Sequence, residues 1–367
     1  MFRWFTGLVS MALLVIFLGC DSSTPTAKDS PQPPVSVQPD DADCVAQLEK
    51  LASSLKRDAN GLITEVSFRD TEIDDTALEH LQGLQNVNAV LLNETKVTDD
   101  GLAALAPLKQ LRRLDLSRCA IGNAGLTHLS DLPNLKSLKI STDGDGNIDD
   151  DGLDHLAGLT NLVSLALDGH FITVDGLTKL KGLTKLEELY LGKTAVDGDA
   201  IQLIADTWEL KKLRVSGNNL DGSAIAPLAT MTTLERLDLS ENQSLFDADM
   251  EHLAPLVGLK DLNLYRLSSL TDAGLQTLAS LANLERLNVD NAVITDAGLP
   301  HLQAMQKLKF LHLGSTQITD AGLPALETLT SLTDLIVTRT GVSPEGAAAL
   351  QTKLPNTKIQ QAYLGDG

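Results

Sequence analysis

Apolar residues recur along most of this chain at a nearly constant spacing. Twelve equivalent positions can be aligned, and eight of their eleven intervals measure 24 residues, two measure 25 and one measures 27. The positions are Ile63, Val87, Leu111, Leu135, Leu162, Leu186, Leu210, Leu234, Leu259, Leu284, Leu308 and Leu332. A fixed period of this length is typical of stacked structural repeats. A solenoid is therefore predicted, because one unit cannot bury its own apolar edge.

The unit that begins at Leu308 shows the pattern most clearly. Leucines alternate with other residues over 308–313. An alternation of period two predicts a short strand whose successive side chains project to opposite faces. The leucines are expected to face the core, while Phe310 and His312 project to the other side of the sheet.

The second half of the unit predicts a turn and a helical segment. Thr316 lies where the chain leaves the strand, and its hydroxyl is expected to bond the backbone of the turn. Thr319 is suited to the N-cap of a helix, and Asp320 to its positive end. Leucines then recur every three residues from 323 to 329, pointing back toward the strand leucines of the same unit.

The pattern L-x-x-L-x-L-x-x-T-x-I-T-D-x-G-L resembles the cysteine-containing, ribonuclease-inhibitor-like subtype of leucine-rich repeats, found also in F-box and GALA-type proteins. The resemblance covers roughly residues 62–359. It implies an α/β solenoid of about twelve repeats, with a curved parallel sheet inside and short helices outside. The polar position after the strand holds Thr71, Thr95, Cys119, Thr194, Asn218, Asn242, Thr316 and Thr340. Three repeats have a different residue at this position, namely His170, Leu267 and Ala292, and less regular turns are expected there.

Charge and cysteine content narrow the classes of partner. The chain of 367 residues carries a formal net charge of −20. Nucleic acid is not an expected partner, because phosphate binding requires a basic face. Three cysteines are too few for a disulfide framework. We expect a monomer.

The N-terminus is typical of an export signal. Arg3 precedes an apolar run from about residue 8 to 19 that is short for a membrane span. The run ends at Gly19-Cys20, which resembles the lipobox of bacterial lipoproteins, although Phe17 stands where leucine is usual. The resemblance implies cleavage after residue 19, lipidation of Cys20 and location in the bacterial cell envelope. An ordinary cleaved signal or an uncleaved anchor is the alternative.

Two further segments precede the repeats. Residues 20–40 are rich in Pro, Ser and Thr, a composition that predicts an extended tether. Residues 41–61 are predicted to cap the first repeat. Within them 41–55 shows one apolar stripe, which predicts an amphipathic helix with Cys44 buried beneath it. After the repeats, residues 360–367 form a C-terminal tail.

The residues between the strand leucines predict the inner face. Its central column is Ser67, Leu91, Asp115, Lys139, Ala166, Tyr190, Arg214, Asp238, Asn263, Asn288, His312 and Ile336. The candidate binding residues on this face are Tyr190, Lys212, Arg214, Arg236, Asp238, Tyr265, Arg286, Phe310 and His312. Among the residues of this face, five form a basic and aromatic island on an otherwise acidic protein, namely Tyr190, Lys212, Arg214, Arg236 and Tyr265. Tyr and Arg often dominate binding energy. Mixed charge that only serves solubility is the alternative.

An acidic insertion, residues 141–151, accounts for the 27-residue interval. Asp143, Asp145, Asn147 and Asp149 place oxygen ligands at alternate positions of a glycine-rich loop, as calcium requires. An EF-hand alignment of this loop loses two strong ligands, including the bidentate glutamate. An enlarged acidic turn is therefore favoured, with weak calcium binding as the alternative. No other cofactor is expected.

The sequence does not indicate catalysis. It contains no G-x-S-x-G, H-E-x-x-H, Walker, dinucleotide-binding or C-x-x-C pattern. The predicted function is a non-catalytic scaffold, tethered to the cell envelope, that binds a protein on its concave face and meets the membrane through its lipid alone. The alternatives are an F-box-like substrate adaptor, an internalin-like adhesin, and a calcium-binding or enzymatic envelope protein that uses the 141–151 loop.

Overall fold

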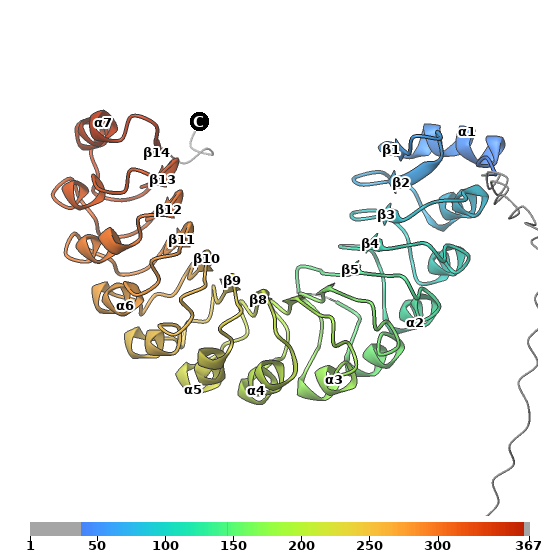
Figure 1. Ribbon diagram of the computed structural model, residues 1–367, viewed down its shortest axis with the longest axis horizontal. Coiled ribbons are helices and arrows are strands. Elements are labelled where there is room, and N and C mark those ends of the chain that lie inside the picture. The colour runs from blue at the N-terminus through green and yellow to red at the C-terminus, as the bar shows by residue number, and fades with distance from the viewer. Residues whose placement is uncertain (1–37, 145, 363–367) are drawn as a thin grey trace, which may run out of the picture. The chain divides into compact units, whose positions relative to one another are not determined.

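The computed structural model describes residues 38–144 and 146–362. Chain contacts separate residues 1–38 from residues 39–367, and the fold below is that of the second unit. Figure 1 shows this unit as an open arc, in which the strands line the inner side and the helices form the outer side. The predicted repeat solenoid is confirmed.

One sheet of fourteen strands runs through the described residues in sequence order. The strands are β1 Ser54–Arg57, β2 Ile63–Ser67, β3 Ala89–Leu91, β4 Arg113–Asp115, β5 Ser137–Lys139, β6 Ser164–Ala166, β7 Glu188–Tyr190, β8 Lys212–Arg214, β9 Arg236–Asp238, β10 Asp261–Asn263, β11 Arg286–Asn288, β12 Phe310–His312, β13 Asp334–Ile336 and β14 Lys358–Gln360. From β2 onward each strand is parallel to the next, as predicted.

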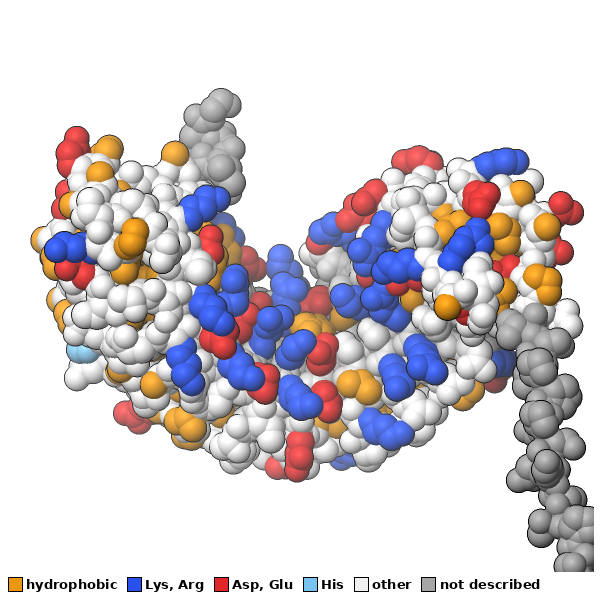
Figure 2. Space-filling model, turned by 45° about the horizontal axis from the view of Figure 1, so that its top comes forward, with side chains coloured by type: hydrophobic (Ala, Val, Ile, Leu, Met, Phe, Trp, Pro, Cys, Tyr) orange, Lys and Arg blue, Asp and Glu red, His pale blue; other side chains and the backbone are white. Residues whose placement is uncertain are grey.

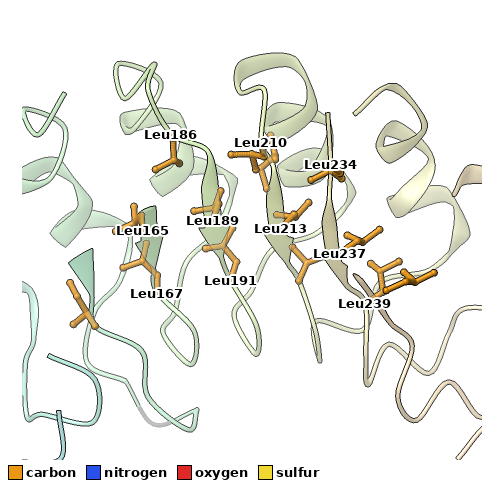
Figure 3. Packing of buried hydrophobic residues seen from close by; sticks show 14 of the residues in the cluster. Leu165, Leu167, Leu186, Leu189, Leu191, Leu210, Leu213, Leu234, Leu237 and Leu239 are labelled. Atoms are coloured by element: carbon orange, nitrogen blue, oxygen red, sulfur yellow. The ribbon is translucent and has the colours of Figure 1, made fainter. Parts of the chain in front are cut away.

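The register stacks equivalent leucines into columns. Leu189, Leu213 and Leu237 are paired neighbours in β7, β8 and β9, and all three are buried. Figure 3 shows them side by side, between two further rows of leucines. Burying a leucine contributes about 2 kcal/mol, so each coil gains much of its stability from contact with its neighbours.

Short helices of two kinds are present, α1 in the N-terminal cap and the others in the return segments, which lead from one strand of the sheet to the next. The α-helices are α1 Ala42–Leu51, α2 Asn123–Leu126, α3 Val174–Lys179, α4 Gly198–Thr207, α5 Gly222–Ile225, α6 Asp272–Leu278 and α7 Pro344–Lys353. The 3-10 helices are η1 Asp75–Gly83, η2 Asp100–Leu105, η3 Thr127–Leu129, η4 Asp150–His155, η5 Ala226–Thr230, η6 Asp247–His252, η7 Leu299–Ala304 and η8 Leu323–Leu326.

The three-residue leucine spacing explains the frequent 3-10 geometry. A 3-10 helix has three residues per turn, so Leu323 and Leu326 project to the same side of η8. Leu329 continues the row after the helix ends, and all three side chains are buried. The short repeat thus keeps one narrow apolar edge against the sheet.

The polar residue after each strand bonds the turn, as predicted. The hydroxyl of Thr316 donates to the carbonyl oxygen of Leu313 at 2.6 Å. The Nδ2 atom of Asn242 bonds its own turn in the same way, donating to the carbonyl oxygen of Leu239 at 2.9 Å, and it also donates to that of Val215 in the preceding coil at 3.0 Å. His170 plays an equivalent part, since its Nε2 lies 2.9 Å from the carbonyl oxygen of Ile140.

Less regular turns were predicted at His170, Leu267 and Ala292, and at Leu267 and Ala292 that prediction is wrong. The amide of Leu267 still donates to the carbonyl oxygen of Leu264 at 3.3 Å, and the amide of Ala292 to that of Val289 at 3.1 Å. The residue before each, Arg266 or Asn291, keeps the left-handed backbone seen in the other turns. The amides of Arg266 and Asn291 also donate to the next coil, to the carbonyl oxygens of Asp290 at 2.9 Å and Gly314 at 3.1 Å. Backbone bonds within the turn and to the next coil therefore maintain the turn without the polar side chain.

A carboxylate links the helix start of one coil to that of the next. In six places an aspartate accepts hydrogen bonds from both the backbone amide and the hydroxyl of a Thr or Ser in the following coil, at 2.5 to 2.8 Å. The pairs are Asp75–Thr98, Asp150–Thr173, Asp247–Thr271, Asp272–Thr295, Asp296–Thr319 and Asp320–Ser343. We call each of these a carboxylate clasp.

The role of Asp320 in this clasp differs from the predicted one. Asp320 was expected to interact with its own helix, but its carboxylate accepts from Ser343 of the next coil, which holds its pKa below the ordinary value. Thr319 likewise donates to Asp296 of the preceding coil. The glycine of the motif is required for space, because a Cβ on Gly322 would lie 2.4 Å from the Oδ1 atom of Asp296.

The N-terminal cap also differs from the prediction. The helix α1 ends at Leu51, and Leu55, predicted to continue it, lies in β1, which pairs antiparallel to β2. The edge of the first coil presents unpaired backbone groups that a strand satisfies and a helix cannot. Cys44 is half-buried and contacts the backbone of Gly83 closely, whereas a fully buried thiol was predicted.

The folded unit begins slightly before the predicted boundary at residue 41. Asp40 was assigned to the tether, but its carboxylate accepts hydrogen bonds from the amides of Ile63 at 2.7 Å and Gln85 at 2.9 Å. At the other end, β14 includes Gln360 of the predicted tail. Both terminal coils are thus held by a few residues beyond the repeat pattern.

We expect Asp272→Ala to lower the free energy of unfolding by about 1–3 kcal/mol, because the amide and hydroxyl of Thr295 lose their acceptor. Urea denaturation followed by circular dichroism measures the change. Asp175→Ala is the matched control, since it removes an exposed carboxylate one position further along an equivalent segment. Equal losses in both variants would contradict a stabilising role for the clasp.

Candidate functional site on the concave face

The first and third residues of the strands form two columns on the inner face, because the middle residue of each strand points into the core. Counted from Glu65 to Gln360, these columns hold seven cationic and six anionic side chains. The cations are Arg113, Lys139, Lys212, Arg214, Arg236, Arg286 and Lys358, and the anions are Glu65, Asp115, Glu188, Asp238, Asp261 and Asp334. The face is nearly balanced in charge, although the chain is strongly acidic. Figure 2 shows Lys and Arg side chains gathered inside the hollow of the arc.

The structure places the candidate binding residues on this face. Tyr190 lies in β7, Lys212 and Arg214 in β8, Arg236 and Asp238 in β9, Arg286 in β11, and Phe310 and His312 in β12. Tyr265 lies two residues beyond β10, in the turn at the edge of the sheet. The positions match the sequence expectation, while their part in binding stays a prediction.

The basic residues are paired, which the sequence pattern did not indicate. The Nζ atom of Lys212 lies 2.6 Å from the Oε1 atom of Glu188. The Nε atom of Arg214 lies 3.5 Å from Asp238 and 3.7 Å from Asp168. A ladder of ion pairs across the strands therefore connects the cations of the expected basic and aromatic island to acidic neighbours.

Glu188 organises one end of this ladder. It accepts hydrogen bonds from Lys212, from Ser164 at 2.9 Å and from the hydroxyl of Tyr190 at 3.2 Å. Burial favours its neutral form, but these bonds outweigh that effect and lower its pKa. Burial, together with the charge of Glu188, raises the pKa of Tyr190 to about 12. Tyr190 is therefore a neutral, fixed hydrogen-bonding ring.

The other end of the ladder surrounds a hollow of about 460 Å³ on β9–β12. The Nε atoms of Arg236 and Arg286 lie 3.0 and 3.6 Å from one shared oxygen of Asp261. The guanidinium of Arg286 stacks over the ring of Phe310, with 4.0 Å between its central carbon and the ring centroid. We call this feature the arginine hollow. It combines cationic and aromatic groups in the way that protein-binding sites often do.

His312 lies next to Phe310 at the border of the arginine hollow. Its ring packs edge-on against Phe310, with 6.3 Å between the centroids. Burial lowers its pKa and outweighs the charge of Asp290, whose Oδ2 atom lies 3.9 Å from Nε2. The imidazole is thus neutral near pH 7.

A second hollow, of about 410 Å³, was missed by the sequence reasoning. It lies near the carboxyl ends of β2–β8, and several of its lining residues come from the turns after the strands. The charged residues that line it are Arg69, Glu94, Asp115, Arg118, Lys139, Asp143, Asp168, Lys193 and Arg214. Because the two-residue alternation continues beyond each strand, extending the inner columns by one step would have included Arg69.

The acidic insertion does not gather its predicted ligands within the described residues. Asp143 pairs with Arg118 at 3.1 Å, and Asp149 accepts from the Nδ2 atom of Asn123 at 2.7 Å. Asn147 forms a bridge with Gly122, and Asp145 lies outside the described residues. Over 38–144 and 146–362, no three His, Cys, Asp or Glu side chains come together as a metal site would require.

The predicted anchor cannot be placed. Cys20, the signal segment 1–19 and residues 20–37 of the tether lie outside the described residues. Within the part of the chain that is described, no helix has the length and apolar character to cross a membrane. Cys44 and Cys119 are both free thiols.

Comparison with known proteins supports the fold. A family model described as a leucine-rich repeat matches residues 109–130 and 304–326. An internalin (inlF) from Listeria monocytogenes is 24% identical, with 88% of this chain and 89% of that chain covered and a TM-score of 0.57. The structure of the yeast Rad7 and Elc1 complex aligns at 18% identity, with 78% and 83% covered and a TM-score of 0.52. No curated protein sequence gives a significant match. The chain therefore has the fold of a leucine-rich repeat solenoid.

The raised pKa of Tyr190 can be tested by alkaline titration of phenolate absorbance. Because Tyr190 stays neutral, we expect Tyr190→Phe and wild type to give the same absorbance change up to about pH 11. Glu188→Gln should move the Tyr190 step to lower pH than in wild type, since it removes the neighbouring negative charge, while burial continues to raise the pKa. Circular dichroism confirms that the proteins remain folded. A smaller change in Tyr190→Phe than in wild type would show that Tyr190 titrates normally.

Proposed function

We propose that this protein is a non-catalytic scaffold that binds a protein ligand on the concave face of β7–β12. The ladder from Glu188 to Phe310 carries the proposal, because it places Tyr and Arg side chains, the residue types that dominate binding energy, on one curved surface. Curved inner faces of this kind are the usual binding surfaces of solenoid proteins.

The ion pairs of the ladder favour binding through preorganisation. Ion pairs at a protein surface contribute little to stability, typically about 0–1 kcal/mol. They do hold long side chains in one geometry before a ligand arrives, so less conformational entropy is lost on association. The Arg214 and Arg236 side chains are 42% and 50% exposed, and therefore remain accessible to a ligand.

The proposal includes attachment to the bacterial cell envelope through a lipid on Cys20. It is supported by the sequence alone: a charged start, a short apolar run and a small residue before the cysteine. The Pro, Ser and Thr-rich segment that follows would act as a spacer. The likeness to internalin and to the Rad7 and Elc1 complex concerns the fold, and their partners are not carried over.

The concave site can be tested by affinity capture from a bacterial envelope extract. Tyr190→Ala/Arg214→Ala should lose proteins that the wild type captures, because both side chains belong to the ladder. Lys181→Ala, on the return segment after α3, is the control and should keep them. Thermal denaturation verifies that each variant is folded. An unchanged captured set would exclude this face as the binding site.

Lipidation can be tested by labelling cells that express the full chain with a radioactive fatty acid. Incorporation is expected in the wild type and in Cys44→Ser, whose thiol packs within the folded unit. It should be lost in Cys20→Ser, because the acceptor thiol is absent. Label that persists in Cys20→Ser would contradict the predicted anchor.

A further inference from the structure

The arginine hollow contains hydrogen-bond donors that lack acceptors. The Oδ1 atoms of Asn263 and Asn288 accept from the backbone amides of Tyr265 and Asp290, at 3.2 and 3.0 Å. These bonds fix the orientation of both amide groups. The Nδ2 groups make no hydrogen bond to any residue in the described ranges, and they line the hollow.

Arg236 and Arg286 provide further hydrogen-bond donors in the hollow. Arg236 and Arg286 approach one shared carboxylate, that of Asp261, and neither guanidinium makes a hydrogen bond to a described residue. Both side chains are 50% exposed. Each guanidinium carries five N–H donors in a planar fork suited to bidentate binding of an acid group. Phe310 supports the plane of Arg286 from one side.

The charged residues that line the hollow are equal in number, because Arg236 and Arg286 face Asp238 and Asp261. Asp238 is already engaged, since it accepts a hydrogen bond from the hydroxyl of Ser240 at 2.6 Å and lies 3.5 Å from Arg214. Arg236 and Arg286 therefore share the carboxylate of Asp261 alone. At physiological ionic strength charges are screened beyond about 8 Å, so a ligand in the hollow responds chiefly to these groups and little to the net charge of the chain. The hollow is thus rich in hydrogen-bond donors.

We infer that the arginine hollow binds an aspartate or glutamate carboxylate of the protein ligand, with an apolar neighbour of that residue packed against Phe310. The inference rests on the proposed function of the concave face and specifies which chemical group of the ligand is recognised. The carboxylate accepts from the guanidinium forks of Arg236 and Arg286 and from the amide of Asn263 or Asn288. Such a charge-assisted pair contributes specificity through geometry as well as charge.

The test is selection of random peptides on phage against the purified full-length protein. Enriched peptides should contain Asp or Glu next to an apolar residue. Synthetic copies, measured by fluorescence polarisation, should bind Arg236→Gln/Arg286→Gln about tenfold or more weakly than wild type. Replacing the acidic residue of the peptide by its amide should weaken binding to the wild type by a similar factor. The same replacement should have little further effect on binding to Arg236→Gln/Arg286→Gln, which already lacks the arginines. Arg113→Gln/Lys358→Gln removes two cations of the same face outside the hollow and should bind normally.

Several outcomes would overturn the inference, and three of them concern the selected peptides directly. They are no enriched peptide, enriched peptides without acidic residues, and equal binding by wild type and Arg236→Gln/Arg286→Gln. Displacement of the peptide by millimolar inorganic phosphate would also overturn it, because the hollow would then be a general anion site. Peptides whose binding is lost in Tyr190→Ala/Arg214→Ala but kept in Arg236→Gln/Arg286→Gln would refute the carboxylate site while supporting the concave face. Peptides insensitive to both variants would refute both proposals.

Discussion

Each coil of this protein completes its core and its hydrogen bonds on the next coil. The strand leucines pack against their equivalents in the neighbouring strands, as Leu189, Leu213 and Leu237 do. Backbone amides in the strands and turns donate across the same boundary. A single coil has neither a closed core nor satisfied backbone groups, so stability arises between coils.

The carboxylate clasps apply the same constraint on the outer side. An aspartate such as Asp272 serves Thr295 of the following coil, and the glycine of that coil leaves room for the carboxylate. Strand pairing on the inner side and carboxylate clasps on the outer side thus both join each coil to the coil that follows it in the sequence. This explains why threonine, aspartate and glycine recur together, although no single coil needs all three for its own helix.

Stacking leaves the concave face free for other chemistry. The middle residue of each strand is committed to the core, while its two neighbours face outward and need not be apolar. On β7–β12 these positions hold an ion-pair ladder and the donor-rich arginine hollow. The curvature brings the columns around one space, so a ligand can contact several coils at once.

The sequence by itself determined the fold, the number of coils and the face on which Tyr190, Arg236 and Phe310 lie. It could do so because a repeat imposes one period on every strand, and the alternation within a strand assigns each side chain to a face. Only the tertiary structure decided which charges meet: that Glu188 holds Lys212 and Tyr190, that two arginines share Asp261, and that Asp320 serves the next coil. It also decided that β1 completes the cap. These contacts join residues of different coils or of the cap, and their partners depend on register, side-chain rotamers and the unpaired edge of the first coil, which the repeat pattern does not encode.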